Sequence, residues 1–154
     1  MQHTRLFLRA LIAFLALPGV IAFGIPLLLL RPRGDNGGFR TMAFAPLFVG
    51  VATLLWCVGE FSVRGRGTLA PWDPPQALVR TGLYRFSRNP MYVGVLLILA
   101  SWAVGWRSSL LGWYALGVAV AFHLRVIVGE EPWLARTYGA VWAEYRARVP
   151  RWLI

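Results

Sequence analysis

The sequence has no lysine, one cysteine, two histidines and six acidic residues among its 154 residues. The single cysteine, Cys57, lies within an apolar run, which excludes a disulfide framework and a metal cluster held by thiolates. His3 and His123 are the only imidazole side chains, too few for the usual ligand sets of a zinc or haem site. We therefore predict that the protein binds no metal.

Because lysine is absent, all sixteen basic residues are arginines, and the formal net charge is +10. Such a charge can indicate nucleic-acid binding, but these arginines lie between apolar segments rather than along one polar face. Hydrophobic residues make up 58% of the chain, charged residues 14%, and the mean hydropathy is +0.58. These values indicate an integral membrane protein whose arginines meet membrane lipids, with no nucleic-acid partner. They do not indicate an oligomeric state.

Four apolar segments are candidates for membrane-spanning helices: residues 10–30, 42–63, 90–106 and 110–129. The first is too long for a cleaved signal peptide and is expected to remain as an anchor, bent near Pro18. The third, with about 17 residues, must tilt, thin the bilayer or pack inside the protein. Aromatic and arginine side chains make residues 132–153 an amphipathic tail. We predict an all-α membrane protein with about four transmembrane helices, a C-terminal helical hairpin and this cytoplasmic tail.

The distribution of arginines predicts the orientation of the chain in the membrane. With four spans, the N-terminus, the loop 64–89 and the tail lie on one side and hold two, five and four arginines. The opposite side holds three arginines between residues 31 and 40 and one more at Arg107. The positive-inside rule therefore places both termini and the loop 64–89 in the cytoplasm.

An arginine-rich loop meets an apolar helix within Thr81–Gly94. Asn89 suits the N-cap position and Pro90 the first helical position, so we expect the helix to begin there. Its free N–H groups and partial positive charge favour a carboxylate or phosphate. Gly94 lacks a side chain, which would let a flat ligand lie against the backbone beside the ring of Tyr92. A capped transmembrane helix with an interfacial tyrosine and a packing glycine explains the same residues.

A second polar motif, Gly-Glu-Glu-Pro at residues 129–132, ends the fourth apolar segment. Adjacent carboxylates are costly near lipid and usually indicate function. The two arms of a helical hairpin return to the same level, so we expect Glu130 and Glu131 to lie near Asn89 and Tyr92. The site would then offer N–H groups and arginine at one end and carboxylates at the other, which suits a zwitterionic ligand.

Together these residues resemble the isoprenylcysteine carboxyl methyltransferase and phospholipid methyltransferase superfamily. The resemblance covers roughly residues 67–152 and rests on Arg-Asn-Pro-Met-Tyr-Val-Gly at 88–94, Glu-Glu-Pro at 130–132, Tyr-Gly at 138–139, Tyr145 and Val-Pro-Arg at 149–151. It implies a polytopic helical enzyme that depends on S-adenosylmethionine. Many carboxyl methyltransferases have histidine where this chain has Asn89, whereas asparagine occurs in phosphatidylethanolamine methyltransferases. Lipid amines therefore stay open as acceptors.

The resemblance also implies roles for individual residues. The expected cofactor-binding residues are Arg88, Asn89, Pro90, Tyr92, Gly94, Glu130 and Glu131. The candidate catalytic residues are His123, Arg85 and Glu131. His123 lies seven residues before Glu130 on the same helical face, although a lone histidine on an apolar face is more often structural. Arg85 and Arg88 are candidate anion contacts, and pairing with lipid headgroups explains them equally well.

We expect S-adenosylmethionine as methyl donor, S-adenosylhomocysteine as product, and an amphiphilic acceptor from the bilayer. An isoprenylcysteine-type carboxylate and a lipid amine are both open. Two alternatives are a methyltransferase of a small apolar thiol or amine metabolite, and a non-catalytic membrane binding or assembly protein. In this interpretation residues 1–63 form a two-helix membrane anchor and residues 64–154 form the catalytic region.

Overall fold

The computed structural model describes residues 15–30, 38–60, 63 and 77–153. Regular structure in these ranges is entirely helical, which confirms the predicted all-α class for this part of the chain. The elements are η1 (Leu15–Gly24), α2 (Ile25–Leu30), η2 (Thr41–Ala43), α3 (Phe44–Glu60), η4 (Gly82–Arg85), α4 (Pro90–Gly105), α5 (Ser109–Leu124), η5 (Arg125–Glu130) and α6 (Glu131–Arg148). The start of the first apolar segment, residues 31–37 of the loop 31–40 and residues 64–76 of the loop 64–89 lie outside the described residues.

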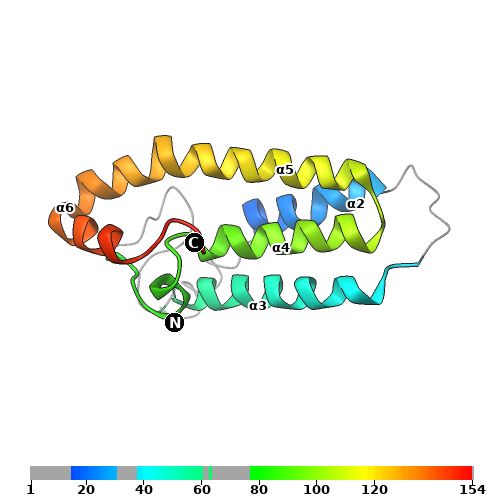
Figure 1. The fold of residues 1–154 in the computed structure, drawn as a ribbon, viewed down its shortest axis with the longest axis horizontal. Coiled ribbons are helices and arrows are strands. Elements are labelled where there is room, and N and C mark those ends of the chain that lie inside the picture. Colours follow the sequence, from blue (N-terminus) through cyan, green and yellow to red (C-terminus); the bar gives the residue numbers. More distant parts are fainter. Residues whose placement is uncertain (1–14, 31–37, 61–62, 64–76, 154) are drawn as a thin grey trace.

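Three long helices lie side by side, with α4 between α3 and α5 (Figure 1). η1 packs against α4, and α2 touches α5. The core between the long helices consists of buried side chains from all three, namely Leu54, Val95, Ile98, Leu99 and Phe122. The bundle is therefore held by apolar packing around α4, the helix that begins at the first polar motif.

Pro26 in α2 explains how the first helix is attached to the bundle. Proline has no N–H group, so an α-helical turn leaves the Ala22 carbonyl without its donor, and a wider π-helical turn leaves the Ile21 carbonyl without one. Trp102 Nε1 donates to Ala22 O at 2.9 Å, and Tyr114 Oη donates to Ile21 O at 3.0 Å. Side chains of α4 and α5 thus satisfy both carbonyls, as buried backbone groups require.

The crossing of α3 and α4 depends on two glycines. A Cβ atom at Gly50 would lie 2.7 Å from the Gly94 carbonyl oxygen, and one at Gly94 would lie 3.0 Å from the Gly50 carbonyl oxygen. A methyl group at Gly50 would force the backbones apart, and one at Gly94 would require its neighbours to shift by a few tenths of an ångström. This close approach of small residues is typical of helix pairs in membranes.

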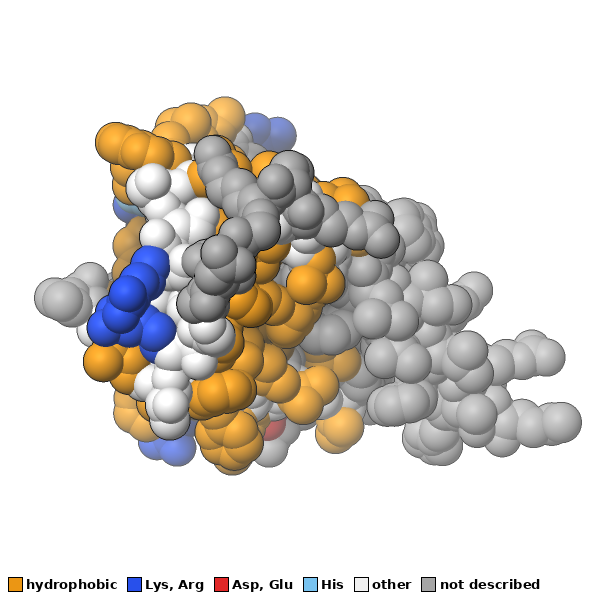
Figure 2. Space-filling view, turned by 90° about the vertical axis from the view of Figure 1, so that its right-hand side faces the viewer, with side chains coloured by type: hydrophobic (Ala, Val, Ile, Leu, Met, Phe, Trp, Pro, Cys, Tyr) orange, Lys and Arg blue, Asp and Glu red, His pale blue; other side chains and the backbone are white. Residues whose placement is uncertain are grey.

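The helices Thr41–Glu60 and Ser109–Arg148 are long and apolar enough to cross a membrane, whereas Pro18–Leu30 and Pro90–Gly105 are apolar but shorter. Large apolar side chains of the long helices, such as Phe48 and Trp113, are exposed. Hydrophobic side chains also cover much of the described surface at the end where α3 begins (Figure 2). The described part of the chain thus has two candidate membrane-spanning helices, and four membrane crossings stay a prediction.

The tail does not continue as one straight helix. Within α6, Gly139 has φ 49° and ψ −121°, a conformation open to glycine and not to a residue with a side chain. The chain changes direction there, and the second half of α6 returns toward the start of α4, where the C-terminus lies (Figure 1). The turn brings residues 149–152 against residues that precede them by some sixty positions.

Candidate functional site

The first polar cluster at the start of α4 consists of Tyr92, Arg125 and Glu130, and we call it the Tyr92 cluster. The Tyr92 hydroxyl donates a hydrogen bond to Glu130 Oε1, and Arg125 Nε donates to the same oxygen at 2.8 Å. Arg125 Nε also lies 3.1 Å from Tyr92 Oη. The Tyr92 ring stacks on Phe122 with centroids 4.3 Å apart. The predicted proximity of the glutamate pair to Tyr92 is therefore confirmed for Glu130.

The second cluster consists of Glu131, Arg88 and Arg151, and we call it the Glu131 cluster. Arg151 donates to both carboxylate oxygens of Glu131, with Nε–Oε1 2.7 Å and Nη2–Oε2 2.9 Å. Arg88 Nη1 donates to Oε1 at 3.0 Å. The side chain of Glu131 is only 10% exposed, against 33% for Glu130. Two guanidinium groups thus compensate a nearly buried carboxylate, and Arg151 binds it in the bidentate geometry that favours arginine.

Asn89 stands at the N-cap position of α4, with Pro90 following as the first helical residue, as predicted. The expected capping hydrogen bond is absent, because the Asn89 side chain does not accept from the first turn of α4. Its Nδ2 atom donates instead to the carbonyl oxygen of Arg151 at 3.0 Å. Arg88 N donates to Pro150 O at 2.9 Å. Asn89 therefore fastens the returning C-terminal segment to the start of α4.

Arg88 lies between its carboxylate partner Glu131 and the ring of Trp142. Its guanidinium carbon lies 5.6 Å from the centroid of the Trp142 ring. Arg88 Nε and Trp142 Nε1 are both buried, and neither has a hydrogen-bond acceptor among the described residues. Burial lowers the pKa of Arg88, although Glu131 opposes this shift. The hydrogen bond to Glu131 raises the pKa of Arg151. Both arginines remain cationic at neutral pH.

The remaining predicted site residues lie apart from the two clusters. His123 is exposed, and its Nδ1 atom accepts a hydrogen bond from Trp152 Nε1 at 3.3 Å. Arg85 is exposed on η4. Gly94 faces α3, where helix packing accounts for its missing side chain. The cofactor role of Gly94 and the catalytic roles of His123 and Arg85 stay predictions.

Residues 40–141 of the chain match the phospholipid methyltransferase family. The match covers more than half of the chain and includes α3, α4 and α5 together with both motifs. The chain belongs to this family. No curated protein and no solved structure matches it. Family membership and the apolar helices together identify a membrane methyltransferase in general terms.

Two arginines of the clusters are not among the residues that the sequence predicts for the site. Arg125 is the only charged residue in the fourth apolar segment, and charged residues in such segments usually face functional interiors. That signal could have found Arg125. In the structure, the π-helical turn η5 brings Arg125 to the carboxylate of Glu130, five residues later. Arg151 ends the Val-Pro-Arg motif at 149–151, but the motif does not indicate its place beside Glu131, which depends on the reversal at Gly139.

Within the family match, the two carboxylates are suited to different tasks. Both carboxylate oxygens of Glu131 accept hydrogen bonds from arginines, which links Arg88 to the C-terminal segment. The predicted cofactor and catalytic roles of Glu131 stay predictions. Glu130 keeps a third of its side chain exposed and is held by one hydroxyl and one guanidinium. A ligand with a cationic or hydroxyl group can therefore reach Glu130 more easily than Glu131.

Proposed function

We propose that the protein is an integral membrane methyltransferase that transfers a methyl group from S-adenosylmethionine to an amphiphilic acceptor. Membership of the phospholipid methyltransferase family supports methyl transfer, and members of this family generally use this cofactor. The observation that carries the proposal is the meeting of both polar motifs at the start of α4, where Tyr92 and Glu130 bond directly.

The donor set fits the cofactor. S-adenosylmethionine carries an ammonium group, a carboxylate, a sulfonium and ribose hydroxyls. The partly exposed carboxylate of Glu130 suits an ammonium or a ribose hydroxyl. Arg88 and Trp142 have buried N–H groups with no acceptor in the part of the chain that the structure describes, and a buried donor without a partner is costly. These two donors suit the cofactor carboxylate. The cofactor would supply an electrophilic methyl group on its sulfonium.

The chain's own residues would contribute position and water exclusion rather than strong acid or base chemistry. In-line methyl transfer depends on holding the two reactants close and aligned. Tyr92, stacked on Phe122, forms a fixed apolar wall beside the Glu130 carboxylate. A carboxylate acceptor needs no base. An ammonium acceptor must first lose a proton to a base. Glu130 is the more exposed of the two cluster carboxylates and would be the base for that step.

The acceptor is proposed to come from the bilayer, as an isoprenylcysteine-type carboxylate or a lipid amine. Incubation with methyl-labelled cofactor tests this. Label in a base-labile ester indicates a carboxylate acceptor, and base-stable label in a lipid extract indicates an amine. Label in a small thiol or amine would favour a metabolite as acceptor. Cofactor binding without incorporation into any of these pools would favour a non-catalytic binding protein.

Replacing Glu130 with glutamine tests the cofactor site. The Glu130→Gln variant is expected to bind S-adenosylhomocysteine about tenfold more weakly, because a charged acceptor becomes a neutral one. Calorimetry on detergent-purified protein measures the affinity. Glu144→Gln is the control, since Glu144 is an exposed carboxylate paired with Arg148 outside both clusters. Equal affinities of wild type and Glu130→Gln would remove Glu130 from the site. If the wild-type protein does not bind S-adenosylhomocysteine, the proposal that it is a methyltransferase is contradicted for every acceptor.

A further inference from the structure

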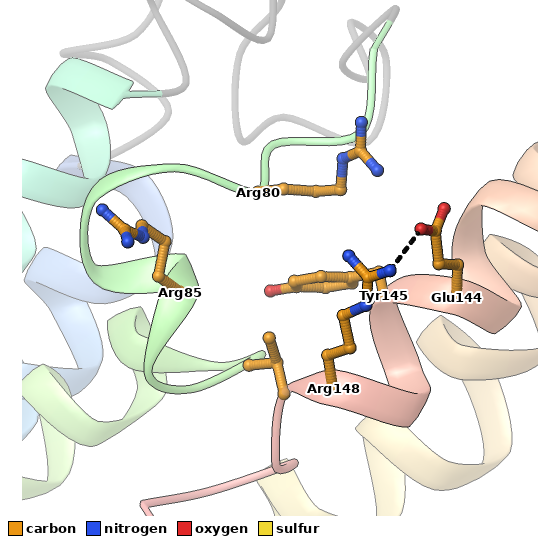
Figure 3. A pocket seen from close by; sticks show the side chains of 6 residues that line it. Arg80, Arg85, Glu144, Tyr145 and Arg148 are labelled. Atoms are coloured by element: carbon orange, nitrogen blue, oxygen red, sulfur yellow. Dashed lines mark ion pairs between the residues drawn. The ribbon is translucent and has the colours of Figure 1, made fainter.

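We propose that a cavity beside the two clusters is a second binding site, for a phosphate-type anion. The cavity has a volume of about 400 Å³ and is lined by Arg80, Arg85, Glu144, Tyr145, Arg148 and Val149. We call it the arginine cavity. None of its residues belongs to the Tyr92 cluster or to the Glu131 cluster. It lies between the end of α6 and the segment that leads into η4 (Figure 3).

The floor of the arginine cavity is fixed by buried contacts. Tyr145 is 6% exposed, and its hydroxyl donates to the Tyr84 carbonyl oxygen at 2.7 Å. Val149 N donates to Tyr145 O at 3.0 Å, and the centroids of the Tyr145 and Trp142 rings lie 5.8 Å apart. The hydroxyl of Tyr145 thus donates to the protein backbone, and the residue lines the cavity. The cationic side chains around it are carried by backbone that this packing holds in place.

The charge around the cavity is unbalanced. Three arginines and one glutamate are among its lining residues, and Glu144 is paired with Arg148 at 2.8 Å. Arg80 lies above the Tyr145 ring and Arg148 passes beside it, while Arg85 lies on η4 across the cavity with its guanidinium turned away from them (Figure 3). Within the described part of the chain, neither Arg80 nor Arg85 has an ion-pair partner. An anion in the cavity would be attracted by this net positive charge, with Arg80 beside the Tyr145 ring as its nearest arginine without an ion pair among the described residues.

A phosphate group matches this arrangement better than a single carboxylate does. Its oxygens can accept from more than one arginine at once, and the guanidinium fork pairs with two phosphate oxygens. The excess of two positive charges equals the charge of a phosphate dianion, whereas a phosphodiester carries one negative charge and is favoured over a carboxylate only by its geometry. The Phe86 side chain next to Arg85 is 68% exposed, which is typical of a segment at a membrane surface. The phosphate could therefore belong to a lipid headgroup or be free in solution.

Binding measurements on the purified full-length protein test the proposal with two probes. Calorimetry measures binding of inorganic phosphate at low salt, and native mass spectrometry counts phosphatidylglycerol retained from mixed micelles with phosphatidylcholine. Arg80→Gln is expected to weaken binding of the phosphate-type probe about fivefold. Glu144→Gln is expected to strengthen it about threefold, because it removes the cavity's carboxylate and releases Arg148. Arg136→Gln is the matched control, an exposed arginine of α6 outside the cavity.

The two probes separate the sources of the phosphate. Retained phosphatidylglycerol that inorganic phosphate displaces supports a lipid headgroup, and binding of inorganic phosphate alone supports a free anion. Arg80→Lys keeps the charge but loses the planar fork, so an affinity between wild type and Arg80→Gln is expected. Failure of both probes to bind wild type would overturn the proposal. Equal losses in Arg80→Gln and Arg136→Gln would also overturn it. None of these measurements uses methyl transfer, so their failure leaves the proposed function standing.

Discussion

Glu130 and Glu131 are adjacent in the sequence but have different surroundings. Glu131 accepts hydrogen bonds from two arginines that lie 43 and 20 residues away in the chain. Glu130 bonds to Tyr92 and Arg125 and remains a third exposed. A nearly buried carboxylate with two charged partners is a structural anchor, whereas a partly exposed one can exchange a partner for a ligand. The two residues are therefore expected to respond differently to the same substitution.

Glu131→Gln is expected to lower the free energy of unfolding by about 2 kcal/mol, because Arg88 would lose its charged acceptor in a buried place. Thermal unfolding in detergent, followed by circular dichroism, measures the effect. Glu144→Gln removes an exposed pair on one helix and is expected to cost no more than about 0.5 kcal/mol. A Glu131→Gln variant as stable as Glu144→Gln would contradict the anchoring role.

At the scale of elements, the position of α4 is set by its contacts with α3 on one side and α5 on the other. Toward α3 it presents Gly94, whose backbone lies against Gly50. Toward α5 it presents Tyr92, which stacks on Phe122 and reaches Glu130. The close approach to α3 thus sets the position of the helix start that carries the Tyr92 cluster. Packing and site geometry depend on the same two helical turns.

Gly50→Ala tests the helix crossing without replacing a predicted cofactor residue, although its added Cβ presses on the backbone of Gly94. It is expected to destabilise the protein by about 1–3 kcal/mol, because the added Cβ would lie 2.7 Å from Gly94 O and 2.8 Å from Ile98 Cγ1. Gly117→Ala in α5 is the matched control, since a Cβ there meets no atom within 4 Å. The control is expected to be neutral or slightly stabilising. Equal midpoints of thermal unfolding for the two variants would show that the crossing tolerates a methyl group.

The reversal inside α6 is expected to depend on Gly139. A Gly139→Ala variant has space for its Cβ but must hold φ at +49°, which costs about 1–2 kcal/mol. Because the turn returns Arg151 to Glu131, the variant should also expose the C-terminal segment to protease earlier in a digestion series. Gly112→Ala provides the comparison, as it adds a methyl group in open space on a regular helix. Identical digestion of both variants would count against the turn as the cause.

At the scale of the whole molecule, the polar features gather at one end of the helical bundle. The Tyr92 cluster, the Glu131 cluster and the arginine cavity all lie where α3 ends, α4 begins and α6 returns (Figure 1). The other end carries the turn between α4 and α5, with Arg107 at φ 50° and Ser108 as N-cap of α5. This asymmetry makes the membrane orientation testable with two single cysteines.

Arg136→Cys and Ser109→Cys report the two ends, since both positions are exposed. From the positive-inside rule we expect a membrane-impermeant maleimide to label Ser109→Cys in intact cells. Arg136→Cys should be labelled only after the membrane is opened. Wild type serves as background, because its Cys57 is buried. The reverse labelling pattern would place the site on the outer side of the membrane.

The sequence by itself determined the helical class, the start of α4 at Pro90 and the meeting of Tyr92 with Glu130. These follow from the length of apolar runs, from cap residues and from hairpin connectivity, all of which are local properties. The tertiary structure alone decided that Asn89 binds Arg151 O, that Gly94 faces Gly50, and that Arg125 and Arg151 complete the clusters. It also decided which carboxylate is buried and where the arginine cavity forms. Such choices depend on the distances between side chains far apart in the chain, and no local pattern determines those distances.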